Sequence, residues 1–301
     1  MLIVPIISKN TKVENLRLGS KTRESSLTDV GFISDSLIAC CDRQAKILYL
    51  LIINLETNSS KIIHQVELQF KPDLFYIYNN TIYIANLNEI ISVYKVVDNK
   101  TLNFIRNYNF GSNYQYHGIY VKDELLFLTG TRSQKVLTVY NLTRMTHNDY
   151  TIPRLENQNL KDIVFIDKDR ILIIASDGVP IGSNKIGKPY KSYIYLYIFN
   201  GRNFNFLDGI SYENCHVDSV VFTGGKYFVT SQLNDTGHIL NGYIENNFLI
   251  PQSHICVADF PHGLAVSKCQ KYIAYTCYST SSVYIGKNTE FGVDLLPNAA
   301  K

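Results

Sequence analysis

Residues 117–130 read HGIYVKDELLFLTG, in which the polar residue His117 is followed by an apolar run, a polar turn and a second apolar run. Short apolar runs joined by a polar turn predict two antiparallel β-strands. The pattern occurs five more times. The other segments are TDVGFISDSLIACC from Thr28, PDLFYIYNNTIYIAN from Pro72, KDIVFIDKDRILIIAS from Lys161, VDSVVFTGGKYFVTS from Val217 and HGLAVSKCQKYIAYTC from His262. Aligned on the first apolar run, the six lead residues are Asp29, Asp73, His117, Asp162, Asp218 and His262.

The spacing of the lead residues predicts the architecture. The steps between them are 44, 44, 45, 56 and 44 residues. A period in the forties built from short strands is typical of four-stranded blades in a radial array. We therefore predict an all-β chain that forms a single six-bladed β-propeller, with seven blades as the less favoured alternative. The predicted blades cover approximately residues 27–70, 71–112, 113–156, 157–212, 213–255 and 256–301 of one domain, 1–301.

The strands within a blade follow from the same pattern. In residues 113–156, KVLTVYNL is the predicted third strand and NDYTIP the predicted outer strand. Closing the ring requires a strand from one end of the chain. Either MLIVPII, residues 1–7 of the segment 1–8, or FGVDLLP near the C-terminus supplies the outer strand of the last blade. The sequence does not choose between them.

Composition excludes several classes of partner. The net charge is +3, which is too small to indicate a nucleic-acid partner. No apolar run approaches the ~18 residues that a membrane span needs. The N-terminus lacks the basic leader and the cleavage site of a signal peptide. The six cysteines form no Cys-x-x-Cys pair, so we expect reduced thiols in a cytoplasmic protein.

The long step from Asp162 to Asp218 marks an insertion of about 12 residues in SDGVPIGSNKIGKPYKS, residues 176–192. It lies between the second and third strands of its blade, and we expect it to overhang the opening that the lead residues encircle. Loops of this length are often lids or binding elements, although an ordinary surface insertion is the alternative. Its lysines would bind an anionic ligand. They are Lys185, Lys188 and Lys191.

The lead residues are the candidate site, because each innermost strand starts at the top of the channel. Four carboxylates at close range repel one another unless a cation, protonation or a salt bridge compensates them. We predict metal ligands at His117, His262 and His216, a catalytic general base at Asp162 or Asp218, and ligand-binding carboxylates at Asp29 and Asp73. A mixed Asp/His set suits Zn²⁺, Mn²⁺ or Fe²⁺, whereas carboxylates and water alone suit Ca²⁺. The alternative is that these residues only cap strands and bind turn amides.

Residues 260–285, FPHGLAVSKCQKYIAYTCYSTSSVYI, resemble the repeat of YVTN-type and lactonase-like β-propellers. The match is partial in residues 116–130 and only patterned elsewhere. Cys269-Gln270 replaces the Asp-Gly turn of that repeat. The resemblance implies the propeller fold. Peptide-amidating lyases, which are also six-bladed, hold a channel metal with histidines, and the predicted ring is similar in kind. No tryptophan-aspartate signature of the best-known scaffold propellers occurs.

Two functional hypotheses remain. The first is a metal-dependent or carboxylate-dependent enzyme of the lactonase, lyase or hydrolase type, acting on a small anionic molecule. The second is a non-enzymatic scaffold that binds a protein partner across the top face. The enzyme hypothesis requires His117 and His262 to face the channel. A scaffold tolerates a channel plugged by apolar side chains and exposes an aromatic patch instead.

Overall fold

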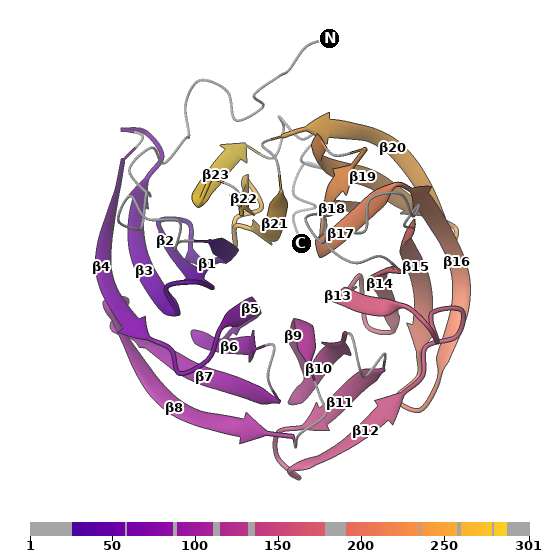
Figure 1. Cartoon of the computed structure of the whole chain (residues 1–301), viewed down its shortest axis with the longest axis horizontal. Helices are drawn as coiled ribbons and strands as arrows, with labels where there is room; N and C mark the ends of the chain where they lie inside the picture. Colours follow the sequence, from indigo (N-terminus) through magenta and orange to yellow (C-terminus); the bar gives the residue numbers. More distant parts are fainter. Residues whose placement is uncertain are drawn as a thin grey trace, which may run out of the picture.

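The computed structural model describes residues 26–57, 59–86, 89–110, 115–131, 136–177, 191–234, 236–257, 260–278 and 280–287. Within these ranges, 23 strands form six antiparallel sheets around a central channel (Figure 1). Five sheets have four strands, and the sixth has three among the described residues. The structure confirms the all-β, six-bladed propeller that the repeat predicts.

Each blade is numbered by its place in the chain and runs from the innermost strand outward. Blade 1 contains β1 (Leu27–Ser34), β2 (Leu37–Asp42), β3 (Ile47–Asn54) and β4 (Ser59–Glu67). Blade 2 contains β5 (Pro72–Tyr78), β6 (Thr81–Asn86), β7 (Ile90–Val97) and β8 (Thr101–Asn109). Blade 3 contains β9 (Tyr116–Lys122), β10 (Leu125–Gly130), β11 (Leu137–Asn141) and β12 (Thr146–Tyr150).

The second half of the ring repeats this order. Blade 4 contains β13 (Asn159–Phe165), β14 (Arg170–Ser176), β15 (Lys191–Phe199) and β16 (Phe204–Glu213). Blade 5 contains β17 (Cys215–Thr223), β18 (Lys226–Leu233), β19 (Thr236–Glu245) and β20 (Phe248–Cys256). Blade 6 contains β21 (Pro261–Val266), β22 (Tyr272–Cys277) and β23 (Ser282–Lys287).

Most of the predicted strands are confirmed, and two points need comment. The outer strand of blade 3 is Thr146–Tyr150 instead of NDYTIP. It ends early because the following Ile152 is buried in the core shared with blade 4. The long connection of blade 4 joins β14 to β15, as the insertion predicts. Residues 178–190, with Lys185 and Lys188, lie outside the described residues, as do both segments proposed to close the ring.

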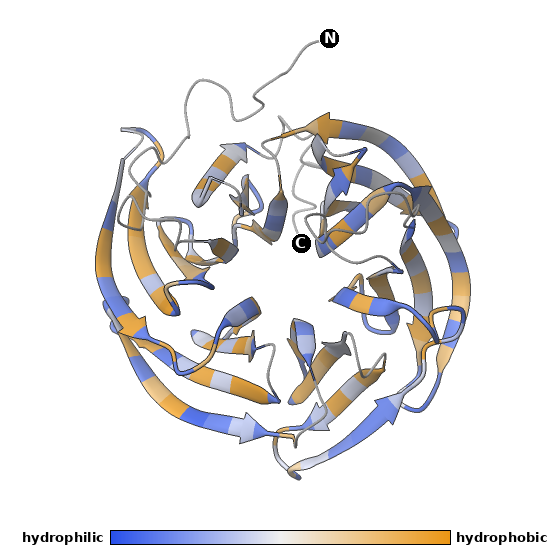
Figure 2. Cartoon of the chain, viewed as in Figure 1, coloured by the Kyte–Doolittle hydropathy of each residue, from blue (hydrophilic) through white to orange (hydrophobic). Residues whose placement is uncertain are grey.

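The core lies between neighbouring blades, and Figure 2 shows hydrophobic residues along the strands of the blades. The run ILYLL in β3 illustrates the arrangement, because Leu48 and Leu50 pack toward blade 2 while Tyr49 and Leu51 pack toward blade 6. Strands covered on both faces show continuous apolar runs without strict alternation. None of the described segments is a helix long and apolar enough to cross a membrane.

A β-bulge near the start of each innermost strand sets the direction of the lead residue. The register between the two inner strands shifts at this point in all six blades. In blade 3, for example, Tyr116 pairs with Gly130 and Ile119 pairs with Leu128, so two residues lie opposite one. A bulge re-aims a side chain out of the regular alternation. These bulges therefore position the candidate site.

Candidate functional site

Four of the six lead residues come together at the channel. The imidazole rings of His117 and His262, from opposite blades, stack with their centroids 5.4 Å apart. Asp73 lies on one side of the pair and Asp218 on the other. His117 Nε2 is 3.3 Å from Asp218 Oδ1 and 4.0 Å from Asp73 Oδ2. His262 Nε2 is 3.6 Å from Asp73 Oδ1 and 3.9 Å from Asp218 Oδ1.

The backbone of the next blade fixes each imidazole. His117 Nδ1 lies 2.9 Å from the carbonyl oxygen of Lys161, and His262 Nδ1 lies 2.8 Å from that of Thr28. A carbonyl oxygen only accepts, so Nδ1 carries the proton in both rings. A neutral ring then presents the Nε2 lone pair to the channel. Burial lowers the pKa of His117 and favours this neutral form, although Asp73 opposes the shift.

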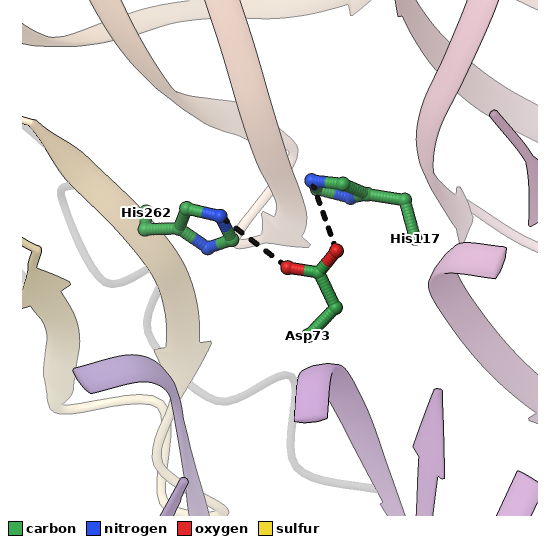
Figure 3. A group of neighbouring side chains, drawn as sticks. All are labelled: Asp73, His117 and His262. Atoms are coloured by element: carbon green, nitrogen blue, oxygen red, sulfur yellow. Dashed lines mark ion pairs between the residues drawn. The ribbon is translucent and has the colours of Figure 1, made fainter. Parts of the chain in front are cut away.

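Asp73 is the unusual member of this group. Its side chain is only 1% exposed, and neither carboxylate oxygen has a hydrogen-bond partner among the described residues. Among the described residues, the Arg43 guanidinium lies beside it, with Nη1 3.8 Å from Oδ1. A buried carboxylate without hydrogen bonds is costly. Figure 3 shows Asp73 pointing between His117 and His262, so two carboxylate oxygens face two imidazole nitrogens.

The distances suit a cation. One ligand atom each from Asp73, His117 and His262 lie within 4.8 Å of one another. Ligand atoms around a tetrahedral Zn²⁺ are about 3.4 Å apart, given bonds of about 2.1 Å. The 3.6 Å separation of His262 Nε2 and Asp73 Oδ1 is close to this value. A small contraction of the group would complete a three-residue site.

Asp218, on the other side, already has a positive partner. The buried Lys161 places Nζ 3.2 Å from Asp218 Oδ1 and 3.2 Å from His216 Nε2. His216 Nδ1 lies 3.5 Å from the hydroxyl of Ser176. Burial alone would raise the pKa of Asp218, but His216, Lys161 and His262 hold it well below its usual range. The Asp218 carboxylate is therefore ionised and compensated.

His216, predicted as a metal ligand, belongs to this Lys161 cluster. Its Nε2 lies 3.2 Å from Asp218 Oδ1. Burial, together with the Lys161 ammonium, lowers the pKa of His216. The neutral imidazole thus accepts a hydrogen bond from Lys161 and lies apart from the group of Asp73, His117 and His262.

Asp29 and Asp162 tie neighbouring blades together. Asp29 accepts hydrogen bonds from the backbone N–H groups of Val30, at 2.8 Å, and Phe75, at 2.6 Å. Asp162 accepts from the N–H groups of Ile163 and Val220, both at 2.9 Å. These bonds engage both oxygens of each carboxylate. This geometry favours the strand-capping alternative for these two residues over ligand-binding and catalytic roles.

The burial of both carboxylates perturbs their acidity. Burial raises the pKa of Asp162 to about 7, although the amides of Val220 and Ile163 and the Ser219 hydroxyl oppose the shift. Burial likewise raises the pKa of Asp29 well above its usual range, against the amides of Phe75 and Val30. A raised pKa can mark a catalytic acid, but here each carboxylate oxygen already accepts a backbone hydrogen bond.

The glycine after each lead histidine has a packing role. A Cβ on Gly118 would lie 2.6 Å from Asp162 Oδ1, and it would also meet the carbonyl oxygen of Lys161. A Cβ on Gly263 would lie 2.7 Å from the carbonyl oxygen of Thr28, and it would also meet Asp29 Oδ1. The His-Gly pair is therefore the complement of the aspartate that leads the next blade.

Three threonines on second strands complete the joints between blades. Thr129 Oγ1 accepts from the N–H of Gly118 at 2.7 Å and donates to the carbonyl oxygen of Lys161 at 2.8 Å. Thr276 makes the equivalent pair with Gly263 N–H, at 2.8 Å, and the carbonyl oxygen of Thr28, at 3.1 Å. Thr230 links Ser219 and His262 in the same way. Each hydroxyl satisfies the amide that a bulge leaves unpaired.

Lys191, the third insertion lysine, is the first residue of β15. Its Nζ lies 2.6 Å from Glu213 Oε1 on the outermost strand of the blade, and both side chains are exposed. Its backbone N–H donates to Asp177 Oδ1 at 2.5 Å. The structure therefore pairs Lys191 with the rim of blade 4, so a ligand would have to compete with Glu213 for it.

Sequence reasoning missed Lys161, Arg43 and the three threonines. The signal for Lys161 was available, because it stands directly before the lead aspartate in the Lys-Asp pair of the fourth repeat. A threonine also recurs near the end of the second apolar run of three repeats. It is Thr129 in TG, Thr230 in VTS and Thr276 in YTC. Arg43 follows β2 in a turn and carries no repeat signal.

Comparisons with known proteins identify the fold only. No family model and no curated protein sequence matches the chain. A candidate 6-phosphogluconolactonase from Bacteroides uniformis superposes with a TM-score of 0.60 at 11% identity, over 90% of this chain and 83% of that one. The WD40 repeats of RRP9 give a TM-score of 0.59 at 9% identity, over 89% and 96% of the two chains. Hydrazine synthase of Kuenenia stuttgartiensis gives 0.59 at 14%, over 91% and 80%.

The fold and the site together define a β-propeller with a buried Asp/His group that can hold a cation at its channel. The similar structures include a lactonase-like protein and a WD40 repeat domain, so they favour neither the enzyme nor the scaffold hypothesis. Propellers host many unrelated activities, and the function has to be argued from the site itself.

Proposed function

We propose that this propeller binds a divalent metal cation between Asp73, His117 and His262 and is a metal-dependent enzyme of the lactonase, lyase or hydrolase type. The observation that carries the proposal is Asp73, a buried carboxylate that faces two imidazole nitrogens and has no hydrogen bond among the described residues. Acceptors that face one another repel unless a proton or a cation lies between them. The mixed ligand set favours Zn²⁺, Mn²⁺ or Fe²⁺ over Ca²⁺.

The exposure of the group indicates the side from which a substrate would approach. The side chains of Asp218 and His262 are 13% and 11% exposed, whereas that of Asp73 is 1% exposed. A substrate would therefore reach the group over Asp218. A bound divalent cation supplies a Lewis acid for a carbonyl or phosphoryl oxygen. Asp218, ionised and 3.3 Å from His117 Nε2, is the carboxylate best placed to accept a proton.

Charge supports an anionic substrate. Two carboxylates, Asp73 and Asp218, face the channel, and the positive groups beside them are Lys161 and Arg43. Adding a divalent cation gives the site a net positive charge. A carboxylate or phosphate group would be attracted to such a site. Lys185 and Lys188 of the insertion stay part of this proposal as ligand-binding residues.

Metal titration tests the proposal. Tag-free protein is stripped with a chelator, and Zn²⁺ and Mn²⁺ are titrated separately by calorimetry, with metal content measured after gel filtration. About one equivalent is expected for the wild type and none for His117→Ala/His262→Ala, because two of three ligands are lost. His254→Ala, an exposed histidine on β20, is the matched control and keeps wild-type binding.

Activity is the second part of the test. Lactones, esters and lyase substrates that carry a carboxylate or phosphate are offered to the metal-loaded protein and to Asp73→Asn. Turnover that requires both the metal and Asp73 supports an enzyme. Stoichiometric metal without turnover on any of these classes would leave a structural cation site and reject the enzymatic half of the proposal.

A scaffold is the second candidate, and exposed apolar side chains favour it. Phe104 and Ile105 on β8 are 55% and 46% exposed, and Ile52 on β3 is 46% exposed. They lie on the third strand of blade 1 and the outer strand of blade 2. The test compares proteins retained by the wild type and by Phe104→Ser/Ile105→Ser. A partner lost only from the variant supports a scaffold that works through the rim.

The cysteines bear on the compartment. All six are thiols and not disulfides, and Cys40, Cys41, Cys215 and Cys277 are buried. Burial raises the pKa of Cys40 and Cys41 well above the usual range, so these thiols are unreactive. We infer a cytoplasmic location from reduced thiols, and YVTN-type repeat membership from residues 260–285. Thiol titration of the protein unfolded in denaturant directly after cell lysis, which should detect six thiols per chain, tests the first inference.

A further inference from the structure

The two halves of the ring are built alike. Asp29, Asp73 and His117 lead blades 1–3, and Asp162, Asp218 and His262 lead blades 4–6 in the same order. The hydrogen bonds repeat as well. Asp29 accepts from the N–H of Phe75 and Asp162 from that of Val220, while His117 meets the carbonyl of Lys161 and His262 that of Thr28. The channel therefore has approximate two-fold symmetry, with Asp73 corresponding to Asp218.

The symmetry breaks first at the residues before Asp29 and Asp162, which are Thr28 and Lys161. Each is the extra residue of its bulge, since Leu27 pairs with Asp42 and Asp29 with Cys41, just as Leu160 pairs with Ala175 and Asp162 with Ile174. Equal registers give the two side chains corresponding directions. Lys161 reaches Asp218 with its ammonium group at 3.2 Å.

Thr28, in the other half, is too short to do the same. Its hydroxyl oxygen is buried, and it has no hydrogen-bond partner in the described part of the chain. The same holds for both oxygens of Asp73. These unsatisfied polar atoms therefore lie in the half of the ring that has Thr28 at the position of Lys161.

The neighbouring imidazole is also present on one side only. His216, two residues before Asp218, accepts from Lys161 at 3.2 Å. The residue two before Asp73 is Lys71, and its Nζ donates to Gln44 at an exposed position, 3.1 Å away. One half of the channel thus holds a complete cluster of ammonium, carboxylate and imidazole. The other half holds a carboxylate, Asp73, whose positive partner among the described residues is the Arg43 guanidinium, at 3.8 Å.

We propose that Lys161 is the resident cation of the channel and that it restricts the protein to one exchangeable metal ion, on the Asp73 side. The claim of one exchangeable metal ion rests on the proposed metal site. A buried carboxylate needs a counter-charge, and the chain provides one for Asp218 within the fold. The residue before the first lead aspartate of each half, Thr28 before Asp29 and Lys161 before Asp162, therefore decides where that half takes its cation from. A lysine there supplies the cation from the chain, and a threonine leaves it to be bound from solution.

Exchanging the two residues tests the inference. Zn²⁺ and Mn²⁺ are titrated into chelator-treated wild type, Lys161→Thr and Thr28→Lys. Lys161→Thr should bind about one equivalent more than the wild type, because Asp218 and His216 are then left without their ammonium partner. Thr28→Lys should bind about one equivalent fewer, because its ammonium group occupies the Asp73 side. Lys168→Thr, an exposed lysine in the turn after β13, should match the wild type.

Further variants keep the test decisive. Lys161→Thr/Asp218→Asn removes the freed carboxylate together with its lysine, and it should return to wild-type stoichiometry. Thr28→Val removes the hydroxyl without adding charge and should leave metal binding unchanged, so a loss confined to Thr28→Lys is due to charge. Thermal melting with and without Zn²⁺ should show a larger metal-induced shift for Lys161→Thr than for the wild type.

The outcomes separate the two proposals. A wild type that binds no metal rejects the proposed function. If Lys161→Thr still gains an equivalent in that case, Lys161 is confirmed as the resident cation. Folded Lys161→Thr that binds no more metal than the wild type would overturn the inference, whatever the wild type binds. Should Thr28→Lys fail to fold, the Lys161→Thr comparison alone decides.

Discussion

His117 and His262 come from opposite blades, yet their imidazole rings stack across the channel with centroids 5.4 Å apart. Their Nδ1 atoms are held by backbone carbonyls of blades 4 and 1, so both Nε2 atoms point toward the channel carboxylates. Three features around the two histidines lead to predictions. Asp218 has a lysine partner and Asp73 has none in the described part of the chain, Gly118 and Gly263 pack against the next blade, and three threonines hydrogen-bond neighbouring blades together.

The two channel carboxylates should respond oppositely to the same isosteric change. In chelator-treated protein, Asp73→Asn removes a buried charge that has no hydrogen bond, so the free energy of unfolding should rise by about 1–2 kcal/mol. Asp218→Asn leaves the Lys161 ammonium buried without its carboxylate, so the free energy should fall by about 3–5 kcal/mol. Urea denaturation at pH 7 measures both.

Added Zn²⁺ provides the control for this pair. It should stabilise the wild type and have no effect on Asp73→Asn, because that variant lacks one of the three ligands. A wild type that is already as stable without metal as Asp73→Asn would show that the Asp73 charge is compensated within the protein.

The His-Gly pairs should not tolerate alanine. The added Cβ of Gly118→Ala or Gly263→Ala meets backbone and carboxylate atoms of the next blade, and these cannot move aside as a flexible side chain would. We expect each variant to lose about 1–3 kcal/mol of stability. Thermal and chemical unfolding measure the loss. Full stability in Gly118→Ala would mean that blades 3 and 4 are not closely packed at Asp162.

The threonine joints make a third prediction. Thr129→Val, Thr230→Val and Thr276→Val each leave a buried amide and a carbonyl of the next blade without their hydroxyl partner. The expected loss is about 1–3 kcal/mol for each. Thr146→Val, at an exposed position of β12, is the control and should stay within about 0.5 kcal/mol of the wild type. Equal effects at all four positions would contradict the role of the joints.

The fold could be predicted from sequence because every blade must bury the same two faces. Aligned segments such as 117–130 and 262–277 show this directly, and the insertion appeared as one long step. The outer strand of blade 3 was misplaced by a few residues because Ile152 is apolar like a strand residue but packs into the blade 3–4 core. The local pattern of apolar residues does not show which blade a residue such as Ile152 packs against.

The sequence predicted which residues lie at the candidate site, but it predicted only part of what each of them does. The lead residues follow from the repeat, but nothing local distinguishes Asp29, which caps the adjoining blade, from Asp73, which faces the channel. The difference depends on where each bulge places its extra residue. In blades 1 and 4 the extra residue precedes the aspartate, whereas in blade 2 the register shift lies between Pro72 and Phe75 and so includes Asp73 itself.

The closure of blade 6 can be tested by truncation. Its last described strand, β23, ends at Lys287, and FGVDLLP begins at Phe291. The third and fourth strands of blade 2 are joined by a connection of the same length, from Val97 to Thr101. Either FGVDLLP or MLIVPII remains a candidate for the outer strand. If FGVDLLP supplies it, removal of residues 288–301 should lower the melting temperature by about 5 °C or more, because a whole strand and its packing are lost.

Removal of residues 1–8 is the matched truncation for blade 6, and in that case it should change the melting temperature by less than about 2 °C. The reverse order would assign closure to MLIVPII. Loss of the outer strand should also expose the edge of β23 and promote association, which light scattering would detect.

His238 should make the protein sensitive to acid. It is buried on β19, 3.8 Å from Cys256 Sγ, and its ring lies edge-on to that of His254. Burial and the neighbouring His254 lower its pKa to about 4, against about 6.5 in an unfolded chain. Between these values the unfolded state binds more protons than the folded state. Stability is therefore full above about pH 6.5 and decreases as the pH falls toward 4.

Replacing His238 should make this dependence shallower. Over pH 7 to 4, urea denaturation of His238→Gln should show a smaller fall in the free energy of unfolding than the wild type. His254→Gln removes the repulsion but not the burial, so its curve should lie between the two. His117 and His216 are also buried with lowered pKa values, and they are unchanged in all three proteins. Superimposable curves would mean that His238 is protonated as readily in the folded chain as in the unfolded one.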